Sequence, residues 1–108
     1  MNELEEIYRN YFCEQNYDLA NDIYKYFKTT PSRFVNEIYI KNHLSIFFSM
    51  HIKIWRAYPG EKYRNKGKNP NVNYVLIPED NKAEIHILIY KGEIVRIKAW
   101  DLHEKGEH

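Results

Sequence analysis

The sequence has a single cysteine, and this scarcity excludes several classes of protein. Cys13 alone forms no intramolecular disulfide and no cysteine zinc cluster, so we expect a small helix-side residue there rather than a catalytic thiol. No apolar run approaches the roughly 18 residues of a membrane-spanning helix. The acidic N-terminal segment MNELEEIYRN is unlike a secretory signal. We therefore expect a cytoplasmic protein that has no contact with a membrane.

Motifs that bind phosphates or metals are also missing. The chain has four glycines, and they form neither G-x-G-x-x-G nor G-x-x-x-x-G-K-S/T, which argues against a nucleotide cradle. The C-terminal segment HEKGEH differs from H-E-x-x-H at position 107, and Gly106 disfavours the helix that would hold the ligands on one face. We expect no metal and no cofactor, and we interpret residues 103–108 as a frayed tail.

The composition suits one small folded domain, which we expect to span residues 1–102. The chain has 108 residues, of which 44% are apolar and 29% are charged. Its ten tyrosines are an excess that suits binding surfaces, because tyrosine combines a large contact area with a polar tip. Net charge is +1, yet residues 1–22 are mainly acidic and residues 53–68 mainly basic. This asymmetry indicates a polarised molecule.

Helical periodicity occurs in the first 30 residues. Apolar residues at positions 4, 7, 8, 11 and 12 follow one helical face, with Asn2 as its cap. A break is expected near Asn16-Tyr17-Asp18, although one long helix through Asn16 is the alternative. A second stripe at positions 19, 20, 23, 24 and 27 predicts a helix that ends before Pro31.

After Pro31 the period changes from 3.6 to 2. Residues 44–54 alternate between apolar and mixed positions, which predicts a long half-buried strand, and Ile38 and Ile40 predict a shorter strand before it. A further strand begins at Val72, the segment PEDNK predicts a turn, and residues 83–100 predict a hairpin. The chain is therefore expected to adopt an α+β fold, with two N-terminal helices packed on one face of a curved, roughly five-stranded antiparallel sheet.

The register of the hairpin follows from which residues it pairs. A three-residue loop Tyr90-Lys91-Gly92, with Gly92 left-handed, places Ile85 opposite Ile97 and Glu84 opposite Lys98. A two-residue loop places Ile85 beside Lys98 instead, so we prefer the longer loop. Extension across the PEDNK turn then sets Tyr74 beside His86.

The C-terminal segment IHILIYKGEIVRIKAWDL, residues 85–102, resembles the closing hairpin of NTF2-like and cystatin-like domains. Its Gly92 turn, the basic alternating strand from Ile94 to Lys98, Trp100 and Asp101 carry the resemblance. The resemblance implies helices on a curved antiparallel sheet. It implies no activity, because this family includes enzymes, ligand binders and interaction modules.

The predicted registers gather cations and aromatics on the sheet face away from the core. Tyr74, His86 and Arg96 are expected in one row, and the long strand adds alternate residues from Phe47 to Trp55. Such a face suits either a protein partner or single-stranded nucleic acid. The partner-binding candidates are Phe47, His51, Lys53, Trp55, Arg56, Tyr58, Lys62, Tyr63, Arg64, Lys66, Lys68, Tyr74, His86, Arg96, Lys98 and Trp100.

The segment WRAYPGEKYRNKGKNPNVNY supplies most of the basic candidates. Its lysines and arginines are spaced irregularly, with Tyr58 and Tyr63 between them. A mobile loop that steers association with an acidic partner and a solvated connector both fit this pattern.

Two functional classes follow, together with a ligand-binding alternative. We expect a small non-catalytic protein that covers a macromolecular partner, as immunity proteins, antitoxins and phage-encoded inhibitors do, and a homodimer through the sheet face is a further option. The alternative is an RNA-binding protein or a metal-independent ribonuclease toxin, with His51 and His86 as acid and base and Arg96 or Lys53 on the phosphate. The third hypothesis is an NTF2-like pocket for a small ligand between helices and sheet.

Overall fold

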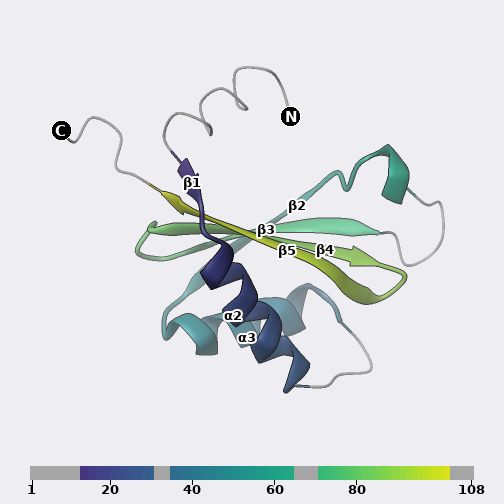
Figure 1. Ribbon diagram of the computed structural model, residues 1–108. Coiled ribbons are helices and arrows are strands. Elements are labelled where there is room, and N and C mark those ends of the chain that lie inside the picture. The colour runs from purple at the N-terminus through teal and green to yellow at the C-terminus, as the bar shows by residue number, and fades with distance from the viewer. Residues whose placement is uncertain (1–12, 31–34, 65–70, 103–108) are drawn as a thin grey trace.

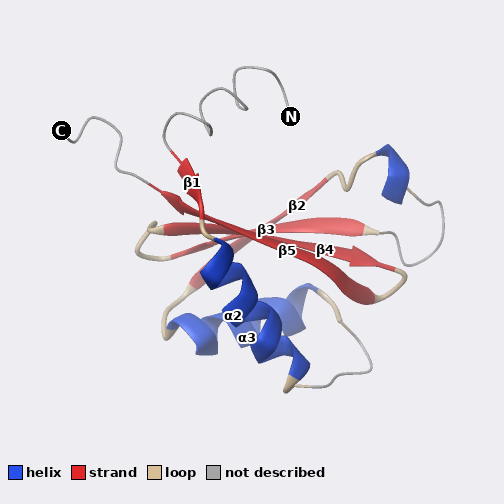
Figure 2. Cartoon of the chain, viewed as in Figure 1, coloured by secondary structure: helices blue, strands red, loops and turns tan. Residues whose placement is uncertain are grey.

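The computed structural model confirms the α+β fold and describes residues 13–30, 35–64 and 71–102. The helix expected over residues 2–12 and the tail at 103–108 lie outside the described residues. One layer holds helices α2 (Tyr17–Lys28) and α3 (Glu37–Phe48). The other is a five-stranded antiparallel sheet, and both helices lie on the same side of it (Figures 1 and 2).

The five strands are β1 (Cys13–Gln15), β2 (Ile52–Ala57), β3 (Val72–Pro78), β4 (Ala83–Tyr90) and β5 (Glu93–Leu102). Their order in the sheet is β1-β5-β4-β3-β2, so β1 and β2 form its two edges. A short 3-10 helix, η1 (Glu61–Tyr63), follows β2 along the chain. Cys13 therefore begins a strand, and the expectation of a helix-side residue was wrong.

Helix α2 begins at the predicted break. The Asn16 side chain accepts a hydrogen bond from the Leu19 amide at 2.9 Å, as an N-cap should. The same side chain donates to Asp101 at 2.9 Å, and its backbone amide donates to Ala99 at 2.8 Å. Asn16 thus ties the start of the helical layer to β5, which directs α2 across the sheet.

Helix α3 replaces the strand expected at Ile38–Ile40 and the first half of the strand expected at residues 44–54. Asn36 caps it by accepting from the Tyr39 amide at 2.9 Å, and Ile40 and Leu44, four residues apart, are fully buried. Ile46, which the alternating pattern places in the core, is 65% exposed. The helix ends at Ser49, whose positive φ of 57° supplies a left-handed cap without the usual glycine.

The β4–β5 hairpin corrects the predicted register. Its loop is only Lys91-Gly92, both with positive φ, as a type I′ turn requires, so the three-residue loop was wrong while the left-handed Gly92 was right. A β-bulge then shifts the register between Leu88 and Ile89. Ile85 therefore pairs with Ala99, not with Ile97 or Lys98. The bulge restores apolar pairing after a loop that alone would have set isoleucines beside cations.

The β3–β4 register is also shifted by one residue from the prediction. Tyr74 pairs with Ile87, and Val75 pairs with His86. Because side chains alternate along a strand, this shift turns Tyr74 toward the helices. It is 5% exposed there, and burial raises the pKa of its hydroxyl above the ordinary value.

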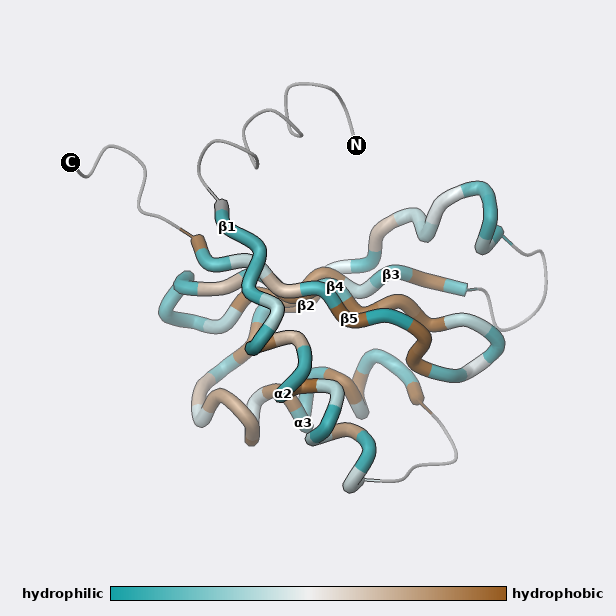
Figure 3. Tube along the Cα trace, viewed as in Figure 1, coloured by the Kyte–Doolittle hydropathy of each residue, from teal (hydrophilic) through white to brown (hydrophobic). Residues whose placement is uncertain are grey.

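The core lies between the helices and the sheet. Both layers contribute aliphatic side chains that are fully buried, and hydrophilic turns close the ends of the sheet (Figure 3). The fully buried aliphatic residues of this core include Ile23, Ile40, Leu44, Ile52, Leu76, Ile85 and Ile87. Over the described residues, no helix has the length and apolar character needed to cross a membrane.

Candidate functional site

The candidate site is the outer face of the sheet, the face turned away from α2 and α3. Alternation along each strand assigns its members, because neighbours of the core residues point to the opposite side. The outer-face residues are Lys53, Trp55, Ala57, Asn73, Val75, Ile77, Glu84, His86, Leu88, Tyr90, Arg96, Lys98 and Trp100. The predicted candidates Lys53, Trp55, His86, Arg96, Lys98 and Trp100 therefore share this face.

One transverse row crosses four strands of the outer face. Trp55 on β2 pairs with Val75 on β3, which pairs with His86 on β4, which pairs with Lys98 on β5. The predicted row of Tyr74, His86 and Arg96 was wrong, because both neighbouring registers differ from those expected. Trp55 is 49% exposed, so a large aromatic side chain meets solvent at the β2 end of the row.

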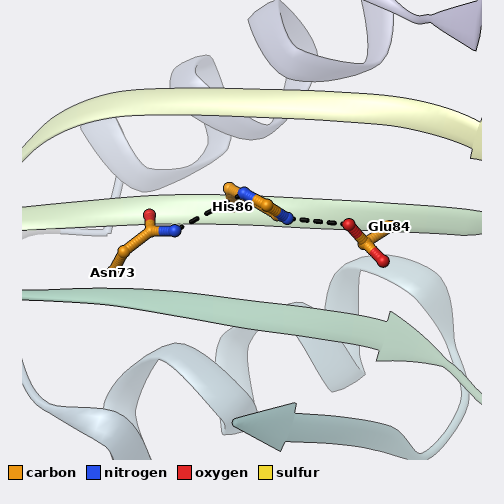
Figure 4. Close-up of polar contacts among 3 residues, drawn as sticks. All are labelled: Asn73, Glu84 and His86. Atoms are coloured by element: carbon orange, nitrogen blue, oxygen red, sulfur yellow. Dashed lines mark hydrogen bonds and ion pairs between the residues drawn. The ribbon is translucent and has the colours of Figure 1, made fainter. Parts of the chain in front are cut away.

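A line of polar contacts on this face joins Asn73 of β3 to His86 and Glu84 of β4 (Figure 4). The His86 Nε2 atom lies 2.8 Å from Glu84 Oε2, and Asn73 Nδ2 lies 3.4 Å from His86 Nδ1. The geometry fits an imidazole that donates from Nε2 to the carboxylate and accepts at Nδ1. Both ring nitrogens are therefore occupied, and the side chains of His86 and Glu84 are only 12% and 11% exposed.

Aromatic contacts hold the two ends of the outer face. The Trp100 ring meets the His86 ring edge-on, with centroids 4.6 Å apart. At the other end, Tyr63 of η1 contacts the Tyr90 ring at 5.6 Å between centroids, and the Arg96 guanidinium lies 5.9 Å from the Tyr63 centroid. The segment after β2 thus contacts the end of the face near the β4–β5 turn.

Asn71 anchors that returning segment. Its amide nitrogen donates to the Tyr63 carbonyl at 2.6 Å, and its amide oxygen accepts from the Lys91 backbone at 2.9 Å. The segment after β2 is therefore held near the β4–β5 turn at Tyr63. Tyr58 is 60% exposed, and Lys62 and Arg64 are exposed on the same segment. Lys66 and Lys68 lie outside the described residues.

Several predicted site residues lie away from the outer face. Phe47 belongs to α3, where its ring contacts Tyr26 at 5.6 Å between centroids, so the expectation of an exposed strand position was wrong. Tyr74 faces the core, as described above. Arg56 lies on the helix-facing side of β2, and its Nε atom lies 3.2 Å from Glu37 Oε1 at the start of α3.

The structure separates the two histidines of the ribonuclease hypothesis. His51 precedes β2 and lies four positions before Trp55, which shares its row with His86 two strands away. At about 3.3 Å per residue and about 4.8 Å per strand, the two Cα atoms are about 16 Å apart. Because Glu84 and Asn73 hold the His86 ring, the two imidazoles do not meet at one phosphate, where each needs hydrogen-bonding reach.

Two polar sites escaped the sequence-based prediction. Asn73 and Glu84 join His86 on the outer face, and the spacing of Glu84 and His86 at i and i+2 was the available signal. In the helical layer, His43 lies 4.5 Å from Tyr39 between ring centroids, and its Nδ1 atom lies 3.1 Å from the Tyr26 hydroxyl. This second site joins α2 to α3 and has a structural role.

Within the three described ranges, no three histidine, cysteine, aspartate or glutamate side chains gather as a metal site would require. Comparison of the chain with family models, with curated proteins and with solved structures finds no match. The resemblance of residues 85–102 to NTF2-like and cystatin-like domains therefore stays a prediction.

Proposed function

We propose that the chain is a cytoplasmic, non-catalytic binding protein that covers a protein partner, in the manner of an inhibitor, an antitoxin or an immunity protein. The observation that carries the proposal is Trp55, a tryptophan that is 49% exposed on an edge strand between two cations. Tryptophan and arginine are enriched at the centres of protein interfaces, where burial of a large ring supplies much of the affinity.

The cations beside Trp55 suit recognition. The Lys53 ammonium contacts the neutral amide of Asn81 at 3.0 Å, so its charge remains available to an acidic group. The Arg56 side chain is 65% exposed even while it contacts Glu37. Exposed charges around an aromatic anchor accelerate association and select partners of opposite charge.

The occupied ring of His86 supports binding over catalysis. A general acid or base needs one nitrogen within reach of the substrate, yet both His86 nitrogens have protein partners. An imidazole with hydrogen-bond partners on both nitrogens fixes the positions of the neighbouring Asn73 and Glu84 side chains on the sheet. A ribonuclease is therefore a weaker explanation of this face than a binding surface.

Site-specific photocrosslinking in the source cells tests the proposal. A benzophenone amino acid at position 55 should give a discrete protein adduct, whereas the same group at Tyr17 should not. Tyr17 is a matched control because it is 68% exposed and lies on α2, in the other layer. Replacement of Lys53 and Arg56 by glutamate should remove the adduct at position 55.

Two results would contradict the proposal. The first is an adduct at position 55 that ribonuclease treatment destroys, together with submicromolar binding to mixed single-stranded RNA at about 150 mM salt, where phosphate contacts are already weakened. The second is equal crosslinking at positions 55 and 17, which would indicate random collision rather than a binding surface.

A further inference from the structure

We propose that the free edge of β2 receives an acidic, extended segment of the protein partner, which pairs with β2 as an additional strand. This inference rests on the proposed function and assigns the chemistry of the partner. Recognition would then combine main-chain hydrogen bonds along β2 with side-chain contacts to Trp55 and its neighbouring cations.

The edge of β2 offers the required hydrogen-bonding groups. β2 pairs with β3 on one side, and within residues 13–30, 35–64 and 71–102 no strand pairs with its other side. Alternate backbone N–H and C=O groups of an edge strand point away from its neighbour. β2 has six residues, or about 20 Å of edge, whereas the opposite edge strand β1 has only three.

The charge of this edge selects an acidic occupant. Lys53 projects on the outer face and Arg56 on the helix-facing side, so an added strand meets a cation on both of its faces. Lys62 and Arg64 follow on the exposed segment after β2. The acids around this edge are Glu37, which contacts Arg56, Glu61, and the turn residues Glu79 and Asp80 beside the start of β2. β2 itself carries two cations and no acid, which favours carboxylates in a segment that pairs with it.

The same charges disfavour a second copy of this chain. Pairing of two β2 strands about a twofold axis brings two copies of Lys53 and Arg56 to one short interface. Like charges on an edge strand are a recognised protection against such self-pairing. An acidic strand carries the opposite charge. The two cations that oppose pairing of β2 with a second β2 therefore favour pairing of β2 with an acidic segment.

The side chains beside the β2 edge favour a partner segment that has apolar residues between its acidic residues. Trp55 presents about half of its surface on the outer face, and Ile54 is only partly buried on the other. Neighbouring residues on adjacent strands contact one another directly. The occupant is therefore a segment in which acidic residues adjoin apolar or aromatic ones, in an extended conformation without proline.

Selection from a random 12-residue peptide display library against the whole chain tests the inference. Enriched peptides should be acidic and free of proline, and their affinity should fall tenfold or more in the Lys53→Glu, Arg56→Glu variant. Lys25→Glu, Lys28→Glu is the matched control: it makes the same change of charge at exposed positions on α2 and should leave the affinity unchanged. Failure to enrich peptides, or enrichment without an acidic excess, would overturn the inference.

Backbone methylation separates strand pairing from side-chain docking. Two versions of an enriched peptide, N-methylated on alternate residues, differ only in which amides lose their hydrogens. Pairing on one edge predicts that one version loses binding and the other keeps it, while amides of residues 52–57 gain protection from hydrogen exchange. Equal binding of both versions overturns the inference, and a specific crosslink at Trp55 would still leave the proposed function standing. Concentration-dependent dimers that pair through β2 would identify a second copy as the occupant and overturn it as well.

Discussion

The two faces of the sheet differ in what their side chains do. The inner face, against α2 and α3, carries aliphatic residues such as Ile85, Ile87 and Leu76, all fully buried. The outer face carries a histidine, a glutamate and an asparagine in contact, with Trp55 and several cations around them. Aliphatic burial supplies most of the stability of a small domain, while mixed polar and aromatic surfaces supply specificity.

This difference teaches that burial alone does not identify the core. Leu88 and Glu84 lie on the outer face, yet they are 0% and 8% exposed. A buried carboxylate needs partners, and Glu84 has His86 at 2.8 Å. The outer face is thus partly closed over its centre and open at the β2 edge, where Trp55 is half exposed. Function is expected at the open edge rather than at the buried histidine.

The largest expected effect is on the inner face. Ile87→Ala removes three methyl or methylene groups from a fully buried position and should lower the free energy of unfolding by about 2–5 kcal/mol. Chemical denaturation monitored by tryptophan fluorescence measures the change. Val95→Ala, at a position that is 46% exposed beside the bulge, is the control and should cost well under half as much. Equal losses would mean that burial of Ile87 in the inner face adds nothing to stability beyond what an exposed valine contributes.

Substitutions in the polar contacts of the outer face should lower the free energy of unfolding by an intermediate amount. His86→Leu removes the imidazole that contacts the buried Glu84 carboxylate, and a hydrogen bond to a charged group contributes about 1.5–3 kcal/mol. A double-mutant cycle with Glu84→Leu should show a coupling of at least about 0.5 kcal/mol, because the two side chains interact directly. Additive losses would show that the contact between these side chains contributes nothing to stability.

Most faces of the C-terminal hairpin were predictable from its sequence, whereas its pairing was not. Alternation assigned Ile85 and Ile87 to the inner face and His86 and Lys98 to the outer face correctly. The bulge interrupts the alternation on β5, so Ile94 packs against the core although it lies four residues from Lys98. The pairing depended on a two-residue turn followed by a bulge. A preference for apolar residues opposite one another selects a register, but it does not show whether a longer loop or a bulge produces that register. The contact of His86 with Asn73 depended on the β3 register, so it was missed.

The sequence-based prediction missed helix α3 for a different reason, because its apolar residues fit both the spacing of a helix and the alternation of a strand. Leu44, Ile46 and Phe48 alternate as in a strand, but Ile40 and Leu44 also lie one helical turn apart. The helix buries Ile40 and Leu44 and leaves Ile46 65% exposed, whereas a strand would bury Ile46 with Leu44. The stop signal was hidden, because Ser49 takes the left-handed position usually occupied by glycine. Trp55 was nevertheless placed on the outer face correctly, because residues 52–54 keep the strand alternation.

A smaller effect is expected where the chain passes from the sheet to the helices. Asn16→Ala removes the α2 cap and the contact with Asp101, and loss of an N-cap costs about 1 kcal/mol. Asn16→Ser restores a capping hydroxyl but does not restore the Asp101 contact, so it should recover most of the lost stability. Thermal unfolding followed by circular dichroism compares the variants. If serine recovers nothing, the contact with Asp101 matters more than the cap.

The smallest effect on stability is expected at Trp55, and this contrast tests the division between the faces most sharply. Trp55→Ala removes a ring that is 49% exposed and whose cross-strand neighbour on β3 is Val75. Cross-strand pairs contribute about 0.2–1 kcal/mol, so the free energy of unfolding should fall by about 0.5 kcal/mol. The affinity for an enriched acidic peptide should instead fall tenfold or more, because an aromatic anchor is worth about 2 kcal/mol when an interface buries it. Denaturant titration and peptide titration of one preparation measure both quantities. A loss of stability above about 2 kcal/mol with unchanged peptide affinity would make Trp55 a core residue and move the functional edge elsewhere on the molecule.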